Sequence, residues 1–139
     1  MRSGKKIWFL VLLLLVNVFT LSACGKSKLS DEFDQREVEE LAANVVDMVN
    51  RGDAEGIQEL SNEQMKQAMT EDVLNQVFDA AKGFGEYKEI LKTDLAGVKD
   101  KATDESIAVA VVKVKYADKE AIYTISFDTD MKLAGLYLK

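Results

Sequence analysis

The spacing of the apolar residues changes once along the chain, at Gly83, and this change constrains the fold class. Before Gly83, apolar residues recur every three or four positions, which is the period of one face of an α-helix. After Gly83 they recur every second position, which is the period of a strand with one buried face. Helices that all precede the strands predict an α+β domain, with the helices packed on one face of an antiparallel sheet.

Cap residues divide the first half into four predicted helices. Ser30 is suited to begin a long helix and Gly52 to end it, because a glycine readily adopts the left-handed conformation after a last turn. Ser61 and Gln64 have the spacing of a capping box, and Thr70 can cap the last helix. The predicted helices, with their caps, cover residues 30–51, 53–60, 61–69 and 70–83.

The second half predicts four strands joined by polar turns. They cover residues 84–98, 107–116, 121–127 and 132–138. The strand over residues 107–116 is apolar on both faces in its first half, with Val109 and Val111 on one face and Ala108 and Ala110 on the other. A sheet with helices on only one face should be polar on the other, so a second copy, a loop or a terminal segment is expected to cover it.

The first 23 residues have the three parts of a signal peptide. Met1–Lys6 is basic, Ile7–Phe19 is an apolar run, and small residues follow. The apolar run is shorter than the roughly 20 residues that a membrane-spanning helix needs. Export is therefore predicted.

The segment Leu21-Ser22-Ala23-Cys24 resembles the lipobox of bacterial lipoproteins, an aliphatic residue and two small ones before a cysteine. The resemblance implies that the Cys24 thiol takes a diacylglycerol, that acyl chains such as palmitate hold the protein to the membrane, and that cleavage falls between Ala23 and Cys24. Cys24 is the one cysteine, so it has no disulfide partner within the chain. An ordinary signal peptide with an incidental cysteine, or an uncleaved anchor, are the alternatives.

The predicted organisation follows from the lipobox. Residues 1–23 form the lipoprotein signal peptide, residues 24–30 the lipidated cysteine and a short tether, and residues 31–139 the folded domain. The protein is expected at the extracytoplasmic face of the cell membrane, attached by lipid.

The order of one long helix, shorter helices and a sheet resembles the nuclear-transport-factor-2-like (NTF2-like) fold, in which one long and two or more short helices pack on a curved antiparallel sheet of about four strands to form a cone. Several stretches are similar to a family of bacterial lipoproteins known as domain of unknown function 3887, over roughly residues 35–138. They are Gly52-Asp53-Ala54, Met65-Lys66, Thr70-Glu71, Gly83-Phe84-Gly85-Glu86-Tyr87 and Phe127-Asp128-Thr129-Asp130-Met131-Lys132-Leu133-Ala134-Gly135-Leu136. The resemblance implies a fold, and it implies no reaction and no catalytic residue.

Composition excludes several function classes. The chain has no histidine, which removes Ser-His and Cys-His nucleophiles and imidazole metal ligands. It also has no glycine-rich phosphate loop, so no cofactor or metal is expected. Three of the 18 basic residues and none of the 24 acidic ones fall in residues 1–23, so the rest of the chain carries 15 basic and 24 acidic side chains, near −9. Such a domain repels phosphate, and no nucleic acid partner is expected.

The leading functional hypothesis is a membrane-tethered, non-enzymatic module that binds a small ligand or an envelope protein, with a pocket between the long helix and the concave sheet. The pocket candidates are Tyr87, Tyr116, Tyr123 and Phe127. One alternative is a structural accessory lipoprotein that forms a homodimer or docks a partner through its sheet. The other is an isomerase- or hydrolase-like enzyme that uses Asp47 or Asp94 as a base with tyrosine donors.

Overall fold

The structure is a computed structural model that describes residues 28–139. The predicted signal peptide over residues 1–23, the cleavage site between Ala23 and Cys24, and the lipid acceptor Cys24 lie outside the described residues.

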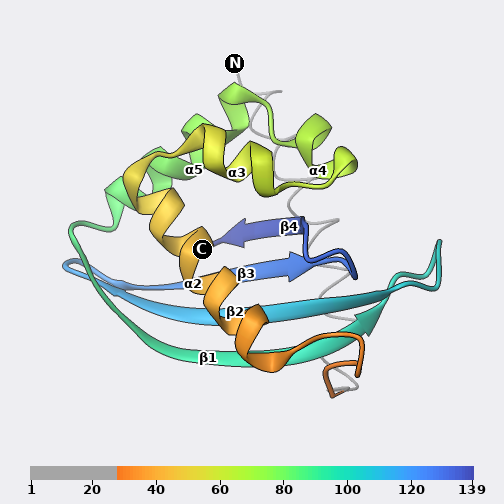
Figure 1. Ribbon diagram of the computed structural model, residues 1–139. Helices are drawn as coiled ribbons and strands as arrows, with labels where there is room; N and C mark the ends of the chain where they lie inside the picture. The colour runs from red at the N-terminus through yellow and green to blue at the C-terminus, as the bar shows by residue number, and fades with distance from the viewer. Residues whose placement is uncertain (1–27) are drawn as a thin grey trace.

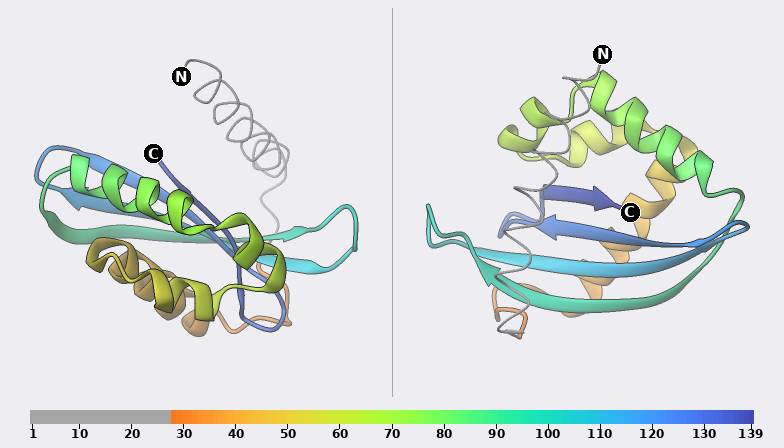
Figure 2. Two further views of the ribbon diagram at one scale, coloured as in Figure 1. Left: turned by 90° about the horizontal axis from the view of Figure 1, so that it is seen from above. Right: turned by 180° about the vertical axis from the view of Figure 1, so that it is seen from behind.

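Within residues 28–139, four helices precede four strands, which confirms the α+β class and the antiparallel sheet predicted from the change of period. The sheet is curved, as the NTF2-like resemblance implies (Figure 1). The elements are α2 (Gln35–Arg51), α3 (Ala54–Leu60), α4 (Glu63–Ala68), α5 (Glu71–Gly83), β1 (Tyr87–Lys99), β2 (Ser106–Tyr116), β3 (Glu120–Phe127) and β4 (Leu133–Leu138). The strands pair in sequence order as an antiparallel meander. Helix α2 crosses one face of the sheet, in contact with β1, β2 and β3 (Figure 1). No described helix lies against the opposite face (Figure 2).

The start of α2 differs from the prediction. Asp34, not Ser30, caps the helix, and its carboxylate accepts a hydrogen bond from the Glu37 N–H at 3.0 Å. Ser30 belongs to a preceding turn, where its carbonyl accepts from the Phe33 N–H. Phe33 and Val38 flank the cap at the positions of a hydrophobic staple, and both are buried in the core. Burial of Phe33 therefore fixes the direction in which the chain enters α2, and the helix is capped four residues later than predicted. The end is as predicted, at Gly52 with φ 66°.

Two further boundaries also differ. Asn62, not Ser61, caps α4, accepting from the Met65 N–H at 2.8 Å, because Ser61 is drawn into a bridge with Leu133 of β4. Strand β1 begins three residues later than predicted, because Gly85, with φ 90°, turns the backbone first. The predicted cap Thr70 is confirmed, since its hydroxyl accepts from the Val73 N–H.

The core fills the space between α2 and the sheet. The inner face of β2 is buried from end to end, and α2 presents a row of small and branched apolar side chains to it. The residues with no exposed surface on these elements and on β3 are Val38, Ala42, Val45, Ala108, Ala110, Val112, Val114, Ala121, Tyr123, Ile125 and Phe127. On the opposite face of β2, Val109 is buried, Val111 is 36% exposed, and Lys113 and Lys115 are exposed. Burial alternates from Val111 to Tyr116 as predicted, while both faces are buried from Ala108 to Ala110.

The first described residues are fixed to one end of the sheet. The backbone of Lys28 and Leu29 lies against Gly97 near the end of β1, and a Cβ atom on Gly97 would clash with the Lys28 carbonyl oxygen. The close approach therefore depends on glycine at this position. It places the start of the domain beside the β1–β2 hairpin.

Candidate functional site

Two buried tyrosines and an asparagine form a hydrogen-bonded network at the opposite end of the sheet. The Tyr116 hydroxyl donates to the Asn50 Oδ1 atom at 2.7 Å, and the hydroxyls of Tyr116 and Tyr123 lie 2.5 Å apart. Each hydroxyl has a single proton to give. Because Tyr116 gives its proton to Asn50, Tyr123 is the donor to Tyr116. We call these three residues the tyrosine–asparagine network.

Burial governs the ionisation of the two tyrosines. It raises the pKa of Tyr116 above the ordinary value, outweighing the opposing effect of the hydrogen bonds to Tyr123 and Asn50. Burial also raises the pKa of Tyr123, and the hydrogen bond with Tyr116 raises it further. Both hydroxyls therefore stay protonated at physiological pH and serve as neutral hydrogen-bonding groups.

Tyr87 extends this network to the surface. Its ring packs edge-on against Tyr116 with centroids 6.0 Å apart, and Tyr87 is 41% exposed. Phe84 packs against the same ring at 5.5 Å, and the Lys119 ammonium lies 4.5 Å from the centre of the Phe84 ring. The structure thus brings together Tyr87, Tyr116 and Tyr123.

The fourth pocket candidate, Phe127, does not join the tyrosines. It is paired with Ala108 at the far end of β3 and has no exposed surface. Tyr123 is equally buried, so the space that was predicted to form a pocket is packed with side chains at these two positions.

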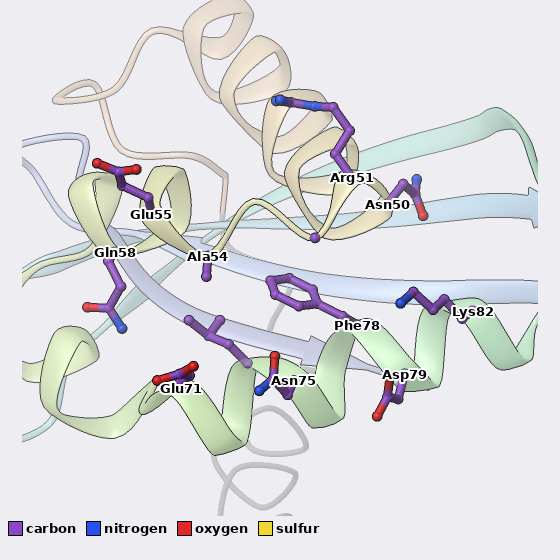
Figure 3. A pocket seen from close by; sticks show the side chains of 12 residues that line it. Asn50, Arg51, Ala54, Glu55, Gln58, Glu71, Asn75, Phe78, Asp79 and Lys82 are labelled. Carbon is purple, nitrogen blue, oxygen red and sulfur yellow. The ribbon is translucent and has the colours of Figure 1, made fainter.

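A groove opens instead between the end of α2, helix α3 and helix α5 (Figure 3). It has a volume of about 820 Å³. The lining residues are Asn50, Arg51, Gly52, Ala54, Glu55, Gln58, Glu71, Leu74, Asn75, Phe78, Asp79 and Lys82. We call it the helix groove, and none of the four predicted pocket residues lines it.

Helix α5 contributes two rows of side chains to the helix groove, because residues four apart share a helix face. Leu74 and Phe78 form a buried row that continues to the exposed Lys82. The second row, formed by Glu71, Asn75 and Asp79, is exposed throughout. The groove therefore has an apolar floor with a cation at one end.

Asn50 joins the helix groove to the tyrosine–asparagine network. Its Oδ1 atom accepts from Tyr116, while its Nδ2 atom is buried and has no hydrogen-bond partner among residues 28–139. An unpaired buried donor costs about 1–3 kcal/mol. The signal for Asn50 was present in the sequence, since it continues the four-residue row of Val38, Ala42 and Val46 as a polar residue.

The charges of the helix groove are unevenly distributed. Arg51 is engaged by Asp47 at 2.8 Å and Asp53 at 3.6 Å. Lys82 forms no ion pair with any residue in the described part of the chain. In Figure 3 Asp79 lies near Lys82 at the same end of the groove, and Glu55 and Glu71 lie toward the other end.

The carboxylates proposed as bases for an enzyme lie on the surface. Asp47 pairs with Arg51 and Asp94 pairs with Lys92 at 3.1 Å, with side chains 61% and 62% exposed. Neither is hydrogen-bonded to Tyr87, Tyr116 or Tyr123 within residues 28–139. The same residues contain no cluster of three or more side chains arranged to hold a metal ion.

Within the described residues, every helix is too short or too polar to span a membrane. A family model described as "Protein of unknown function (DUF3887)" matches residues 42–136. No curated protein is significantly similar to the chain. Among solved structures, the NMR structure of a protein from Ruminococcus gnavus ATCC 29149 is similar, with a TM-score of 0.71 and 20% sequence identity over 81% of this chain and 96% of that one. At this identity the similarity shows a shared fold.

Proposed function

The chain belongs to the family described as "Protein of unknown function (DUF3887)", and because that description names neither a reaction nor a ligand, we propose a function from the residues of the chain itself. The protein is a membrane-anchored lipoprotein with an NTF2-like domain. This domain binds a small ligand in the helix groove and does not convert it.

Two observations support the lipid anchor. The lipobox residues Leu21 to Cys24 follow a basic and apolar signal sequence. The domain then begins at once, since Lys28 is already fixed against Gly97. Four residues reach at most about 14 Å, so the tether is too short to serve as a linker to anything but a nearby surface.

The anchor is tested by Cys24→Ala, with Ser27→Ala as the matched control that keeps the thiol. Wild type and Ser27→Ala should partition into the detergent phase of a Triton X-114 extract, and Cys24→Ala should not enter it as a processed protein. Mass spectrometry of the mature N-terminus identifies the acylated cysteine. A processed Cys24→Ala protein that still partitions with detergent would refute the anchor.

The NTF2-like assignment rests on the order and placement of the elements. One long helix crosses a curved four-stranded meander, and three shorter helices gather beyond its β4 edge (Figures 1 and 2). This arrangement corresponds to the cone expected for that fold.

Ligand binding rests on the composition of the helix groove. Leu74 and Phe78 offer an apolar floor, and polar groups from three helices surround it. The observation that carries the proposal is the groove itself, a cavity of about 820 Å³ lined by apolar, amide and charged side chains from α2, α3 and α5. Concave sites of this size with a few polar groups are typical of ligand binding.

Binding without turnover is supported by the state of the acid–base groups. Tyr116 and Tyr123 stay protonated because burial raises the pKa of each hydroxyl. Asp47 and Asp94 are exposed in ion pairs, away from both tyrosines. A general base has to lie within hydrogen-bond reach of the proton that it removes, and the carboxylates that line the groove, Glu55, Glu71 and Asp79, belong to residues that are exposed to solvent.

Binding is tested by NMR titration of the lipidated protein in detergent micelles, with N-acetyl-leucinamide as a neutral probe. Shifts should concentrate on Ala54, Leu74 and Phe78, and Ala54→Trp, which fills the groove, should abolish them. Ala102→Trp, in the exposed β1–β2 turn, is the matched control. Shifts that survive Ala54→Trp, or no shift up to roughly 10 mM probe, a weak-binding limit for a fragment, would refute the groove as a binding site.

A second function, docking of a partner or a second copy through the sheet, is favoured by one observation. Val111 is 36% exposed on the sheet face that no described helix covers. Burial of Val111 against a partner would remove this apolar surface from water, which favours association.

A further inference from the structure

The open sheet face, which is the face opposite to α2, has an apolar half and a charged half. Strand register and the exposed positions of β2 identify its side chains. The apolar half is formed by Ala96, Val98, Ile107, Val109 and Val111. The charged half is formed by Glu89, Lys92, Asp94, Lys113, Lys115 and Glu120. No described helix covers either half (Figure 2).

The apolar half is the half next to the tether. The backbone of Lys28 lies against Gly97, whose neighbours in β1 are Ala96 and Val98. If Cys24 carries the lipid, the four residues from Cys24 to Lys28 hold this half within about 14 Å of the bilayer. Because β1 is an edge strand, a bilayer this close is within reach of the open sheet face. The apolar part of this face is therefore the part that the anchor holds at the membrane.

Apolar surface remains accessible in this half. Val111 is 36% exposed, and Ala96, Val98 and Ile107 are half-buried. Val109, which pairs with Ala96, is buried. Contact with a bilayer transfers such surface from water to hydrocarbon, which is favourable. The apolar half is therefore suited to rest on lipid.

The distribution of charge turns the same face toward the membrane. The open sheet face carries three lysines and three acidic residues, and two of the lysines are paired, Lys92 with Asp94 at 3.1 Å and Lys113 with Glu120 at 3.4 Å. On the other side of the sheet, residues 31–51 contain seven acidic and two basic residues, a net charge of −5. Anionic headgroups therefore repel the α2 side and not the open sheet face.

We infer that the apolar half of the open sheet face rests on the lipid bilayer that carries the anchor, with α2 turned to the aqueous phase. The inference rests on the proposed lipid anchor, and it names a lipid surface as the occupant of the face for which docking is proposed. Val98, Ile107 and Val111 contact the lipid, and the charged half lies farther from the tether. In a domain without lipid, the same face stays open to a second copy.

Quenching of tryptophan fluorescence by brominated lipid tests the contact. The one tryptophan, Trp8, precedes the predicted cleavage site, so the processed protein has none. Thr124→Trp adds a probe beside Val111 on the open sheet face, and Asn44→Trp is the matched control at an exposed position of α2. Each lipidated protein is placed in vesicles of three parts brominated phosphatidylcholine to one part phosphatidylglycerol. Compared with unbrominated vesicles, Thr124→Trp should lose most of its fluorescence and Asn44→Trp should lose none.

Two variants at one position separate a membrane from a second copy. In the Thr124→Trp protein, Val111→Glu sets a carboxylate against anionic headgroups, so the fluorescence should be restored. Val111→Lys adds a side chain whose apolar stem stays in the lipid while its ammonium reaches the headgroups, so quenching should persist. Either charge disfavours an apolar contact between two copies. Lys113→Trp, at an exposed position of the same face, is the second probe should Thr124→Trp fail to fold.

The outcomes separate this inference from the proposed anchor, which flotation with the vesicles reports independently. A lipidated protein that does not float would refute the anchor and this inference with it. Flotation with equal quenching at both probes, or with none on the open sheet face, would overturn the membrane contact and leave the anchor in place. Quenching that persists in Val111→Glu would also overturn it. Loss of quenching in Val111→Lys, with unchanged circular dichroism, would overturn it in favour of a second copy or a protein partner.

Discussion

Removing either tyrosine hydroxyl should destabilise the domain, and by different amounts. Tyr116→Phe leaves the Tyr123 hydroxyl without an acceptor and the Asn50 Oδ1 atom without a donor. Each unsatisfied buried polar group costs about 1–3 kcal/mol, and the cost at Asn50 is at the lower end because this residue is only half-buried. We therefore expect the free energy of unfolding to fall by about 2–4 kcal/mol in Tyr116→Phe. Tyr123→Phe removes one hydrogen bond and strands no donor, which costs about 0.5–1.5 kcal/mol.

The double variant provides the sharper test of this reasoning. Adding Tyr123→Phe to Tyr116→Phe removes the stranded hydroxyl, so the double variant should be more stable than Tyr116→Phe alone by about 1 kcal/mol. Urea unfolding of residues 26–139, followed by far-ultraviolet circular dichroism, measures all four free energies of unfolding. Equal losses in the two single variants, or additive losses in the double variant, would refute the assigned direction of the hydrogen bonds.

Three other predictions concern the network, the tether and the open sheet face. Burial raises the pKa of Tyr116 and Tyr123, so the folded state keeps protons that the unfolded state releases above about pH 10. Above this pH the free energy of unfolding should fall by up to about 1.4 kcal/mol per pH unit for each tyrosine. In urea titrations over the same range, the variant with both tyrosines changed to Phe should lose less. Parallel curves would contradict the shifted ionisation. Gly97→Val should displace the Lys28 backbone and make this segment more sensitive to limited proteolysis, whereas an unchanged digestion pattern would show that the close approach is dispensable. Residues 26–139 should dimerise at high micromolar concentration in light scattering and Val111→Lys should prevent it, whereas a monomer in both would exclude self-association through this face.

The fold class could be predicted because hydrophobic period is a local property. A helix or strand needs its buried positions at fixed spacing, and that spacing is visible in any short window of sequence. The cap residues were harder to predict, since several candidates compete within one turn. Asp34 prevails over Ser30 because Phe33 is buried, and Asn62 prevails over Ser61 because Ser61 bridges to Leu133. Both decisions depend on contacts that only the folded chain makes.

Three of the four predicted pocket residues meet in the fold, but none of the four lines the helix groove. Tyr87 and Tyr116 meet because they are directly paired across β1 and β2, and Tyr123 follows on the neighbouring strand. Asn50 lies 66 residues before Tyr116, so no local pattern links the two. The helix groove depends on how α2, α3 and α5 pack together, and the position of Phe127 depends on strand register. Spacing in the sequence does not determine either feature.

The attachment of Lys28 to Gly97 has a consequence for the orientation of the domain. If Cys24 carries the lipid, the four intervening residues keep this end of the sheet within about 14 Å of the bilayer. Within β1, ten residues lead from Tyr87 to Gly97, or about 33 Å before curvature, so the tyrosines and the helix groove lie at the end of the sheet opposite to the attachment. The short attachment also limits rotation of the domain about its anchor. Ligand would therefore enter and leave the groove from the aqueous phase, and not from the lipid.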